Sequence, residues 1–170
     1  MYKIIFKSEN LDFINVSTNL IDEYLIMMNN PKIQGFVSKE TRIYNREGEI
    51  EWINSKLENN DSVYSIIERN SGKFVGNIEL MNIENGTSEI GICLTPNFQD
   101  KHYGTEALKR VIQYGFNELK LDEIYLKVFS NNARAIHCYK KLGFIEYKIT
   151  KNVKIMDNEE VDDVYMKLRK

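Results

Sequence analysis

Apolar residues along this chain follow two spacings, one typical of strands and one typical of helices. Alternating or continuous apolar runs predict strands over residues 2–6, 11–16, 62–68, 73–82, 88–94, 123–129, 144–150 and 162–168. Helical spacing predicts helices over residues 19–28, 46–57, 104–119 and 132–142, the last closed by Gly143. This order predicts one mixed sheet with helices on both faces, of the α/β (α+β) class.

Turn signals and composition indicate a single domain. Asn29-Asn30-Pro31 is expected to end the first helix, and Asn70-Ser71-Gly72 and Asn85-Gly86 mark turns between strands. The chain has no internal repeat, low-complexity segment or interdomain linker. Its 170 residues and 42% hydrophobic content are sufficient for one hydrophobic core.

Charge and cysteine content exclude several classes of protein. A formal net charge of −2, with no run of lysine and arginine, argues against a general nucleic-acid binder. Cys93 and Cys138 lack metal or redox spacing, so we expect small apolar residues in a reducing compartment and no metal site. No apolar run reaches membrane-spanning length, and residues 1–7 are too quickly charged for a signal peptide. We therefore expect a cytoplasmic protein with no membrane partner.

The loop between the strand ending at Leu94 and the helix beginning near Gly104 is a candidate phosphate site. The first amide groups of a helix lack intrahelical acceptors and lie at its positive end, so they suit a pyrophosphate. Gly104 allows close backbone approach. The GxGxxG and GxxxxGK[ST] motifs are absent, which disfavours a nicotinamide or ATP site.

Two motifs together resemble the GNAT superfamily of N-acetyltransferases. Gln99-Asp100-Lys101-His102-Tyr103-Gly104 is similar to its Gln/Arg-x-x-Gly-x-Gly/Ala pyrophosphate loop, with His102 in place of the first glycine. Residues 132–144 are similar to its Asn-x-Arg-Ala-x-x-x-Tyr-x-Lys-x-Gly-Phe segment. Residues 74–80 and 88–92 look like the third and fourth strands of the ribosomal-protein acetyltransferase branch. The resemblance covers roughly residues 61–170, and earlier residues match only loosely.

The resemblance implies a single domain over residues 1–170, with acceptor-pocket helices at about 18–58 and an acetyl-CoA-binding core at about 61–170. It implies a mostly antiparallel sheet of about seven strands, splayed between the fourth and fifth. The cofactor arm would pair with the strand edge formed by Ile92, Cys93 and Leu94, whose amides can face the thioester oxygen. The other implied cofactor residues are Gln99, Asp100, Lys101, His102, Tyr103, Gly104, Thr105, Asn132, Arg134, Ala135 and Tyr139.

The implied reaction is attack of a neutral amine on acetyl-CoA in a ternary complex, which releases coenzyme A. Tyr139 is the candidate acid, because a tyrosine with a pKa of about 10 keeps its proton at neutral pH and can donate it to the leaving sulfur. Alternatively, Tyr139 only faces the core. Asn132 either caps the helix or bonds to the pantetheine arm, and Arg134 either contacts phosphates or pairs with surface carboxylates.

The general base is not defined by the resemblance. Some family members carry a glutamate in the fifth strand, where this chain has Lys127. Glu79 and Glu89 are the remaining strand carboxylates on the acceptor side, and Glu84 lies further out. At neutral pH about one lysine-like amine in 2500 is neutral, against about one α-amine in ten, so a weak base favours an α-amine acceptor.

Three functions are consistent with the sequence. The first is acetyl transfer to a peptide N-terminus, polyamine or small-molecule amine. The second is a non-catalytic acyl-CoA-binding regulatory module, favoured if His102 disturbs the loop, and the third is a protein-interaction domain. A homodimer is common in the family. The acidic residues Asp157, Glu159, Glu160, Asp162 and Asp163 form either a site that attracts a cationic acceptor or a solvated turn.

Overall fold

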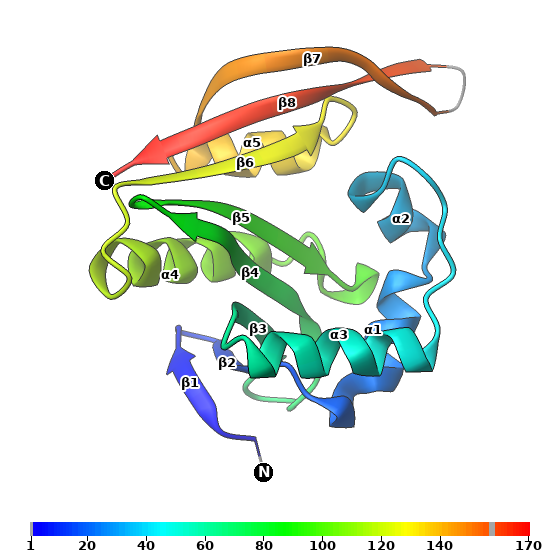
Figure 1. Cartoon of the computed structure of the whole chain (residues 1–170), viewed down its shortest axis with the longest axis vertical. Helices are drawn as coiled ribbons and strands as arrows, with labels where there is room; N and C mark the ends of the chain where they lie inside the picture. The colour runs from blue at the N-terminus through cyan, green and yellow to red at the C-terminus, as the bar shows by residue number, and fades with distance from the viewer. Residues whose placement is uncertain (1, 157–158) are drawn as a thin grey trace.

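A computed structural model describes residues 2–156 and 159–170 of the chain (Figure 1). Its strands are β1 (Ile4–Lys7), β2 (Leu11–Asn15), β3 (Ser62–Glu68), β4 (Phe74–Glu84), β5 (Thr87–Leu94), β6 (Glu123–Phe129), β7 (Ile145–Met156) and β8 (Glu159–Arg169). Its α-helices are α1 (Ile21–Met28), α2 (Pro31–Val37), α3 (Arg46–Glu58), α4 (Tyr103–Asn117) and α5 (Ala133–Lys141). Among the described helices, none combines the length and hydropathy that a membrane crossing requires.

The strands form one sheet in the order β1-β2-β3-β4-β5-β6-β8-β7, and only the β5–β6 pair is parallel. The mixed sheet of the sequence prediction is therefore present. The described residues form the eight strands that the apolar pattern predicts, consistent with the implied sheet of about seven. The family's third strand corresponds to β4, so the additional strand is β1. It is held at the edge by Phe6, whose ring lies 4.7 Å from that of Phe13 and 4.8 Å from that of Tyr64.

The parallel pair separates soon after it begins. β5 and β6 pair only at Thr87–Glu123, Ser88–Ile124 and Glu89–Tyr125 within the described residues. Beyond Glu89, β5 remains paired with β4, whereas β6 remains paired with β8, and Figure 1 shows the two strands diverging. The predicted splay is thus present. The family's fourth and fifth strands correspond to β5 and β6 of this structure. It leaves one edge of β5 open from Ile90 to Leu94.

Both faces of the sheet are covered by helices, because successive strand residues point to opposite sides. On β3, Tyr64 and Ile66 belong to a core that includes residues of α4 and α5. Val63 and Ile67, which flank this pair on the same strand, belong to a second core, which contains residues of α1, α2 and α3. The helices therefore form two separate layers, as the sequence pattern predicted.

Helix α2 was not predicted from the sequence. Asn29-Asn30-Pro31 does end the first helix, since α1 stops at Met28, but Pro31 is also the first residue of α2. The Asn30 side chain accepts a hydrogen bond from the amide of Lys32 at 3.0 Å. An asparagine cap followed by proline is a helix start signal. Residues 29–31 therefore mark both the end of α1 and the start of α2, of which the sequence prediction included only the first.

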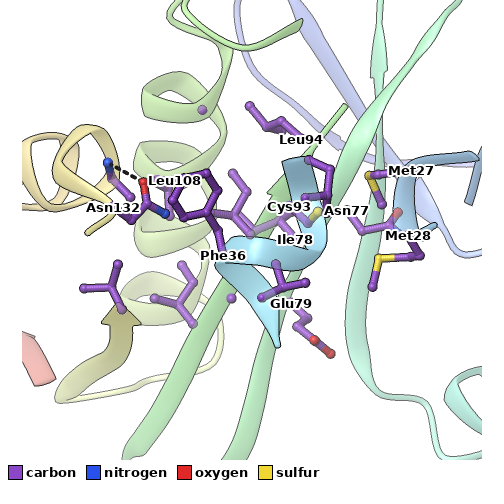
Figure 2. A pocket seen from close by; sticks show the side chains of 18 of the residues that line it. Met27, Met28, Phe36, Asn77, Ile78, Glu79, Cys93, Leu94, Leu108 and Asn132 are labelled. Carbon is purple, nitrogen blue, oxygen red and sulfur yellow. Dashed lines mark hydrogen bonds between the residues drawn. The ribbon is translucent and has the colours of Figure 1, made fainter. Parts of the chain in front are cut away.

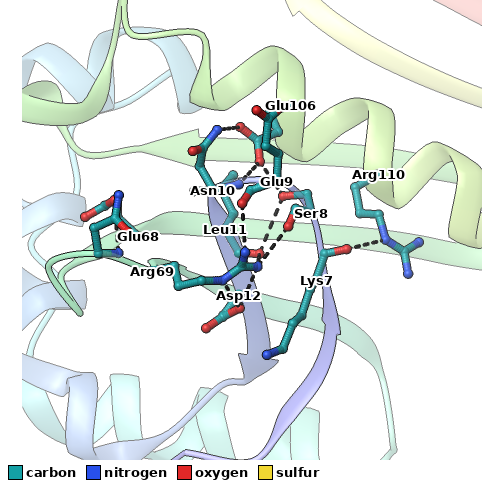
Figure 3. A network of polar contacts seen from close by, with 11 residues as sticks. Lys7, Ser8, Glu9, Asn10, Leu11, Asp12, Glu68, Arg69, Glu106 and Arg110 are labelled. Carbon is teal, nitrogen blue, oxygen red and sulfur yellow. Dashed lines mark hydrogen bonds and ion pairs between the residues drawn. The ribbon is translucent and has the colours of Figure 1, made fainter.

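A polar network fixes the β1–β2 turn against the first turn of α4 (Figure 3). The Glu106 carboxylate accepts hydrogen bonds from the Ser8 hydroxyl at 2.6 Å, the Asn10 amide at 2.7 Å and the Asn10 side chain at 3.0 Å. Arg69 binds the Asp12 carboxylate at 3.0 Å on the opposite side of the same turn. These contacts join segments almost a hundred residues apart and fix the start of α4 relative to the sheet.

A substitution at Gly76 tests the close approach of β4 and β5. A Cβ atom at Gly76 would lie 2.0 Å from the carbonyl oxygen of Cys93 and 2.8 Å from the Cα of Leu94. Because both are backbone atoms, we expect Gly76→Ala to lower the free energy of unfolding by about 3 kcal/mol, measured by denaturant titration. Gly72→Ala is the control, since φ is +68° there but nothing lies within 4 Å; we expect a loss of about 1 kcal/mol. Equal losses would contradict the clash.

Candidate active site

The separation of β5 and β6 opens a cavity of about 1110 Å³, at the upper end of the range typical of small-molecule sites. Its wall comes from α1, α2 and α3 on one side and from α4, α5 and β8 on the other, with β4, β5 and β6 between them. Figure 2 shows side chains from several of these elements around the cavity, among them Phe36, Cys93 and Asn132. The site is therefore built from both of the segments predicted to form it.

The loop before α4 has a backbone conformation suited to an anion. Asp100 and His102 are both left-handed, with φ of 57° and 65°. His102 is the residue before α4, and its exposed side chain makes no capping hydrogen bond. The first amides of α4 therefore stay available to a phosphate. His102 adopts the positive φ expected of the glycine it replaces, so the substitution has preserved the loop geometry.

Arg134 joins α5 to this loop. Its guanidinium donates to the Asp100 carboxylate at 3.0 Å and to the Gln99 side-chain oxygen at 2.8 Å. Gln99 in turn donates to the carbonyl of Leu94 at 2.9 Å, at the end of β5. Of the two roles predicted for Arg134, pairing with a carboxylate is present. Because Arg134 also lines the cavity, its contact with a phosphate stays a prediction.

Asn132 caps α5 at the opposite wall of the cavity. Its side-chain oxygen accepts a hydrogen bond from the amide of Ala135 at 3.3 Å, drawn in Figure 2. The predicted cap is confirmed, and Asn132 also lines the cavity. Nearby, the Thr105 hydroxyl lies 3.2 Å from the Cys138 sulfur, a contact that joins α4 to α5. The two helices that would hold a cofactor are thus linked directly.

These features fit a long thioester cofactor with a pyrophosphate. The open edge of β5 offers backbone groups to its amide-bearing arm, and the start of α4 offers amides to its phosphates. Most predicted cofactor residues line the cavity: Ile92, Cys93, Leu94, Gln99, Asp100, His102, Gly104, Thr105, Asn132, Arg134, Ala135 and Tyr139. The side chains of Lys101 and Tyr103 instead contact the ring of Phe98, at 5.5 Å and 5.9 Å. Neither is among the lining residues.

Tyr139 belongs both to the core and to the cavity wall. Its ring is 9% exposed and lies 5.8 Å from that of Phe144. Among the described residues, no hydrogen-bond partner of its hydroxyl is found. Burial raises the pKa of Tyr139 above its usual value, so the hydroxyl is protonated at neutral pH. The ring of Tyr139 therefore packs in the core, as one of the two predictions stated. The residue also lines the cavity, which a proton donor to a bound cofactor has to do.

Of the two predicted base candidates, Glu79 and Glu89, Glu79 is the one with a lysine partner and a pKa raised by burial. Its carboxylate on β4 lies 3.5 Å from the Lys56 ammonium of α3. Burial raises the pKa of Glu79, while Lys56 opposes that shift. Gly91, paired with Glu79 across β4 and β5, has no side chain to cover this carboxylate: a Cβ there would lie 3.9 Å from its oxygen. Glu89 also lines the cavity and accepts a hydrogen bond from Asn82 at 3.4 Å.

The structure adds polar residues that the sequence did not identify. Glu49 of α3 is 7% exposed, lines the cavity, and has its pKa raised by burial. Asn77 of β4 lies at the end of a buried hydrogen-bonded chain in which the Tyr24 hydroxyl is 2.6 Å from Ser65 and Ser65 is 2.9 Å from Asn77. Glu49 was missed because it lies in the segment that matches the family only loosely.

The acidic segment near the C-terminus divides into parts with different surroundings. Asp157 lies outside the described residues. Glu160 is exposed, and Asp162 binds the Lys151 ammonium at 2.8 Å. Asp163 is 2% exposed and lines the cavity. The solvated-turn alternative is thus wrong for Asp163, because strand alternation on β8 turns neighbouring carboxylates to opposite sides.

Comparison with known proteins identifies the family. The acetyltransferase (GNAT) domain matches residues 12–145, so the chain belongs to the GNAT acetyltransferase family. The spermidine N(1)-acetyltransferase of Escherichia coli is 40% identical over 75 residues, which are 43% of this chain and 40% of that protein. An uncharacterized N-acetyltransferase, p20 of Bacillus licheniformis, is 31% identical over 69% of this chain and 67% of its own length. The matched segments span 40% to 57% of the length of the spermidine acetyltransferases.

Solved structures show the same fold. A spermidine N-acetyltransferase from Vibrio cholerae, in complex with CoA and spermine, has a TM-score of 0.85 at 21% identity and covers 94% of this chain and 95% of that one. A ribosomal-protein-alanine N-acetyltransferase from Brucella melitensis has a TM-score of 0.76 at 15% identity, over 93% of this chain and 99% of that one. At these identities the likeness is one of fold. It does not establish the ribosomal-protein branch.

Substitutions at His102 test the loop. Because His102 has a positive φ, we expect His102→Gly to keep coenzyme A affinity within about twofold of wild type. A β-branched residue resists this conformation, so we expect His102→Val to weaken binding about tenfold. Isothermal titration calorimetry with coenzyme A measures both. If valine bound as well as glycine, the loop backbone would have no part in cofactor binding.

Proposed function

We propose that this protein is an acetyl-CoA-dependent N-acetyltransferase that acts on a polycationic amine. The observation that carries the proposal is the position of Tyr139, which lines the same cavity as the open β5 edge and the anion-binding loop. Acetyl-CoA would supply the acetyl group as a thioester. The residues of this chain would bind the cofactor, accept a proton from the amine and donate one to the leaving group.

Tyr139 would donate the proton. Burial raises its pKa, which keeps the proton on the hydroxyl until a more basic group forms nearby. The group that takes up the proton would be the sulfur of coenzyme A, as its bond to the acetyl carbon breaks and negative charge develops on it. The backbone amides of β5 at Ile92 to Leu94 would stabilise negative charge on the thioester oxygen. No metal is needed for either step.

Glu79 would accept the proton from the amine. Its raised pKa makes it a stronger base than a solvated glutamate, and Gly91 leaves it uncovered. Lys56 keeps part of the population ionised, since its ammonium lies 3.5 Å away. Such a base weakens the inference that the enzyme favours an α-amine acceptor.

The acceptor is a polyamine or a similar aliphatic polycation. Glu49, Glu79, Glu89 and Asp163 all line the cavity, and they attract cations. The spermidine acetyltransferases among the relatives support the same acceptor class. The ribosomal-protein branch suggested by the strand motifs would require a peptide N-terminus, for which the cavity offers less evident charge complementarity.

Tyr139→Phe tests the acid. We expect thiol release from acetyl-CoA in the presence of spermidine to fall at least about tenfold, because the proton donor is lost, while acetyl-CoA binding is unchanged. Tyr125→Phe is the matched control, since Tyr125 on β6 is not among the lining residues. Equal turnover in Tyr139→Phe and wild type would remove Tyr139 from the chemistry. Cofactor binding without turnover of any amine would favour the non-catalytic module.

Glu79→Gln tests the base through pH dependence. A base must be ionised, so kcat/KM should fall as pH falls through the raised pKa of Glu79. We expect the variant to lose this acid limb and about a hundredfold in kcat/KM. Glu84→Gln, on the same strand but outside the cavity, should keep the wild-type profile. An acid limb that persists in Glu79→Gln would assign it to another group.

A further inference from the structure

One buried carboxylate in the cavity has no part in the proton transfers. Asp163 of β8 has a side chain that is 3% exposed, and the residue lines the cavity. Its Oδ1 atom is buried and, within the described residues, lacks a hydrogen-bond partner. Burying an unpaired carboxylate oxygen is unfavourable by several kcal/mol unless a donor or cation compensates it. Because this oxygen is not accessible, the carboxylate depends on a cation at its other oxygen, Oδ2.

The other oxygen of Asp163 has a weak partner. The Lys39 ammonium lies 3.5 Å from Oδ2, and the Lys39 side chain is 50% exposed. Charge-assisted hydrogen bonds are shorter, about 2.7–2.9 Å. A long ion pair to a half-exposed lysine contributes little to stability. A ligand ammonium can therefore replace Lys39 at little free-energy cost.

Lys39 can leave Asp163 without disturbing the segment that carries it. This segment joins α2 to α3, and two amide side chains hold its backbone, one buried (Gln34) and one exposed (Asn29). Gln34 accepts a hydrogen bond from the amide of Arg42 at 3.0 Å, and Asn29 bonds to both backbone groups of Tyr44, at 2.8 Å and 2.9 Å. The side chain of Lys39 takes no part in these contacts. Its exchange needs only a change of rotamer.

The position of Asp163 suits a second charge on the acceptor. Asp163 approaches the cavity from β8, whereas the proposed base, Glu79, approaches from β4 on the other side of the β5–β6 separation. An extended polyamine that reaches from β4 to β8 would place one amine at Glu79 and an ammonium at Asp163. A monoamine can occupy only one of these positions.

We propose that Asp163 determines specificity by binding a second ammonium of the acceptor, which displaces Lys39 as the resident cation. This inference rests on the proposed function, since the acceptor must lie in the same cavity. The carboxylate stays paired throughout, because one cation replaces another. An acceptor with a single amine leaves Lys39 in place and gains nothing from Asp163.

Calorimetric binding of spermidine and octylamine to the protein loaded with coenzyme A tests the proposal. These ligands are similar in length but differ in charge. We expect Asp163→Asn to weaken spermidine binding about tenfold or more and to change octylamine binding less than about twofold. We expect Lys39→Gln to tighten spermidine binding about two- to fivefold, because the competing cation is gone. Lys32→Gln, which removes an exposed lysine of α2 that is not among the lining residues, is the matched control.

Equal weakening of both ligands in Asp163→Asn would overturn the proposal, since it would indicate a general structural effect. Weaker or unchanged spermidine binding in Lys39→Gln would overturn the displacement. The second variant changes a half-exposed side chain, so it stays informative if Asp163→Asn fails to fold.

Thiol release with the same amines separates this inference from the proposed function. Wild type that binds spermidine in an Asp163-dependent way but acetylates no amine would contradict the proposed function and leave the cation subsite intact. Acetylation of both amines with the same KM in wild type and Asp163→Asn would contradict the subsite and leave the function intact.

Discussion

The structure depends on the separation of two parallel strands after three residue pairs. β5 continues with β4 and β6 continues with β8, so each strand is stabilised on one side and open on the other. An open strand edge in a protein core would leave backbone groups unpaired, which is unfavourable. Here the edge borders a cavity, where a ligand can supply the missing hydrogen bonds. The separation of β5 and β6 thus accounts both for the open strand edge and for the cavity beside it.

The surrounding elements keep this opening in a fixed shape. Glu106 fastens the start of α4 to the β1–β2 turn, and Arg134 fastens the start of α5 to the loop that precedes α4. Both anchors lie where helices present free amides, so they define the geometry of the anion-binding end without occupying it. At the other end, α2 and α3 close the cavity with carboxylates and apolar side chains. Under the proposed function, this division would give a phosphate-binding half and a cation-binding half.

His102 shows how a motif can change while its geometry persists. The family places glycine at this position because the backbone there needs a positive φ. Histidine tolerates this conformation at some cost, and the fixed positions of β5 and α4 impose it. The backbone conformation that the motif requires is therefore present despite the substitution. A motif position is better judged by the backbone it must adopt than by residue identity alone.

The sequence by itself determined the mixed sheet and the two helical layers, because local periodicity encodes them. The family resemblance predicted most of the cavity-lining loop residues and Tyr139, because its two motifs are each contiguous in the chain. The sequence did not identify α2 as a helix, since Pro31 was interpreted only as a stop, and it did not distinguish Asp163 from its exposed neighbours. Only the tertiary structure decided that Glu49, Glu79 and Asp163 share one cavity. They lie on three elements far apart in sequence, and no local pattern encodes which side chains meet when a sheet opens.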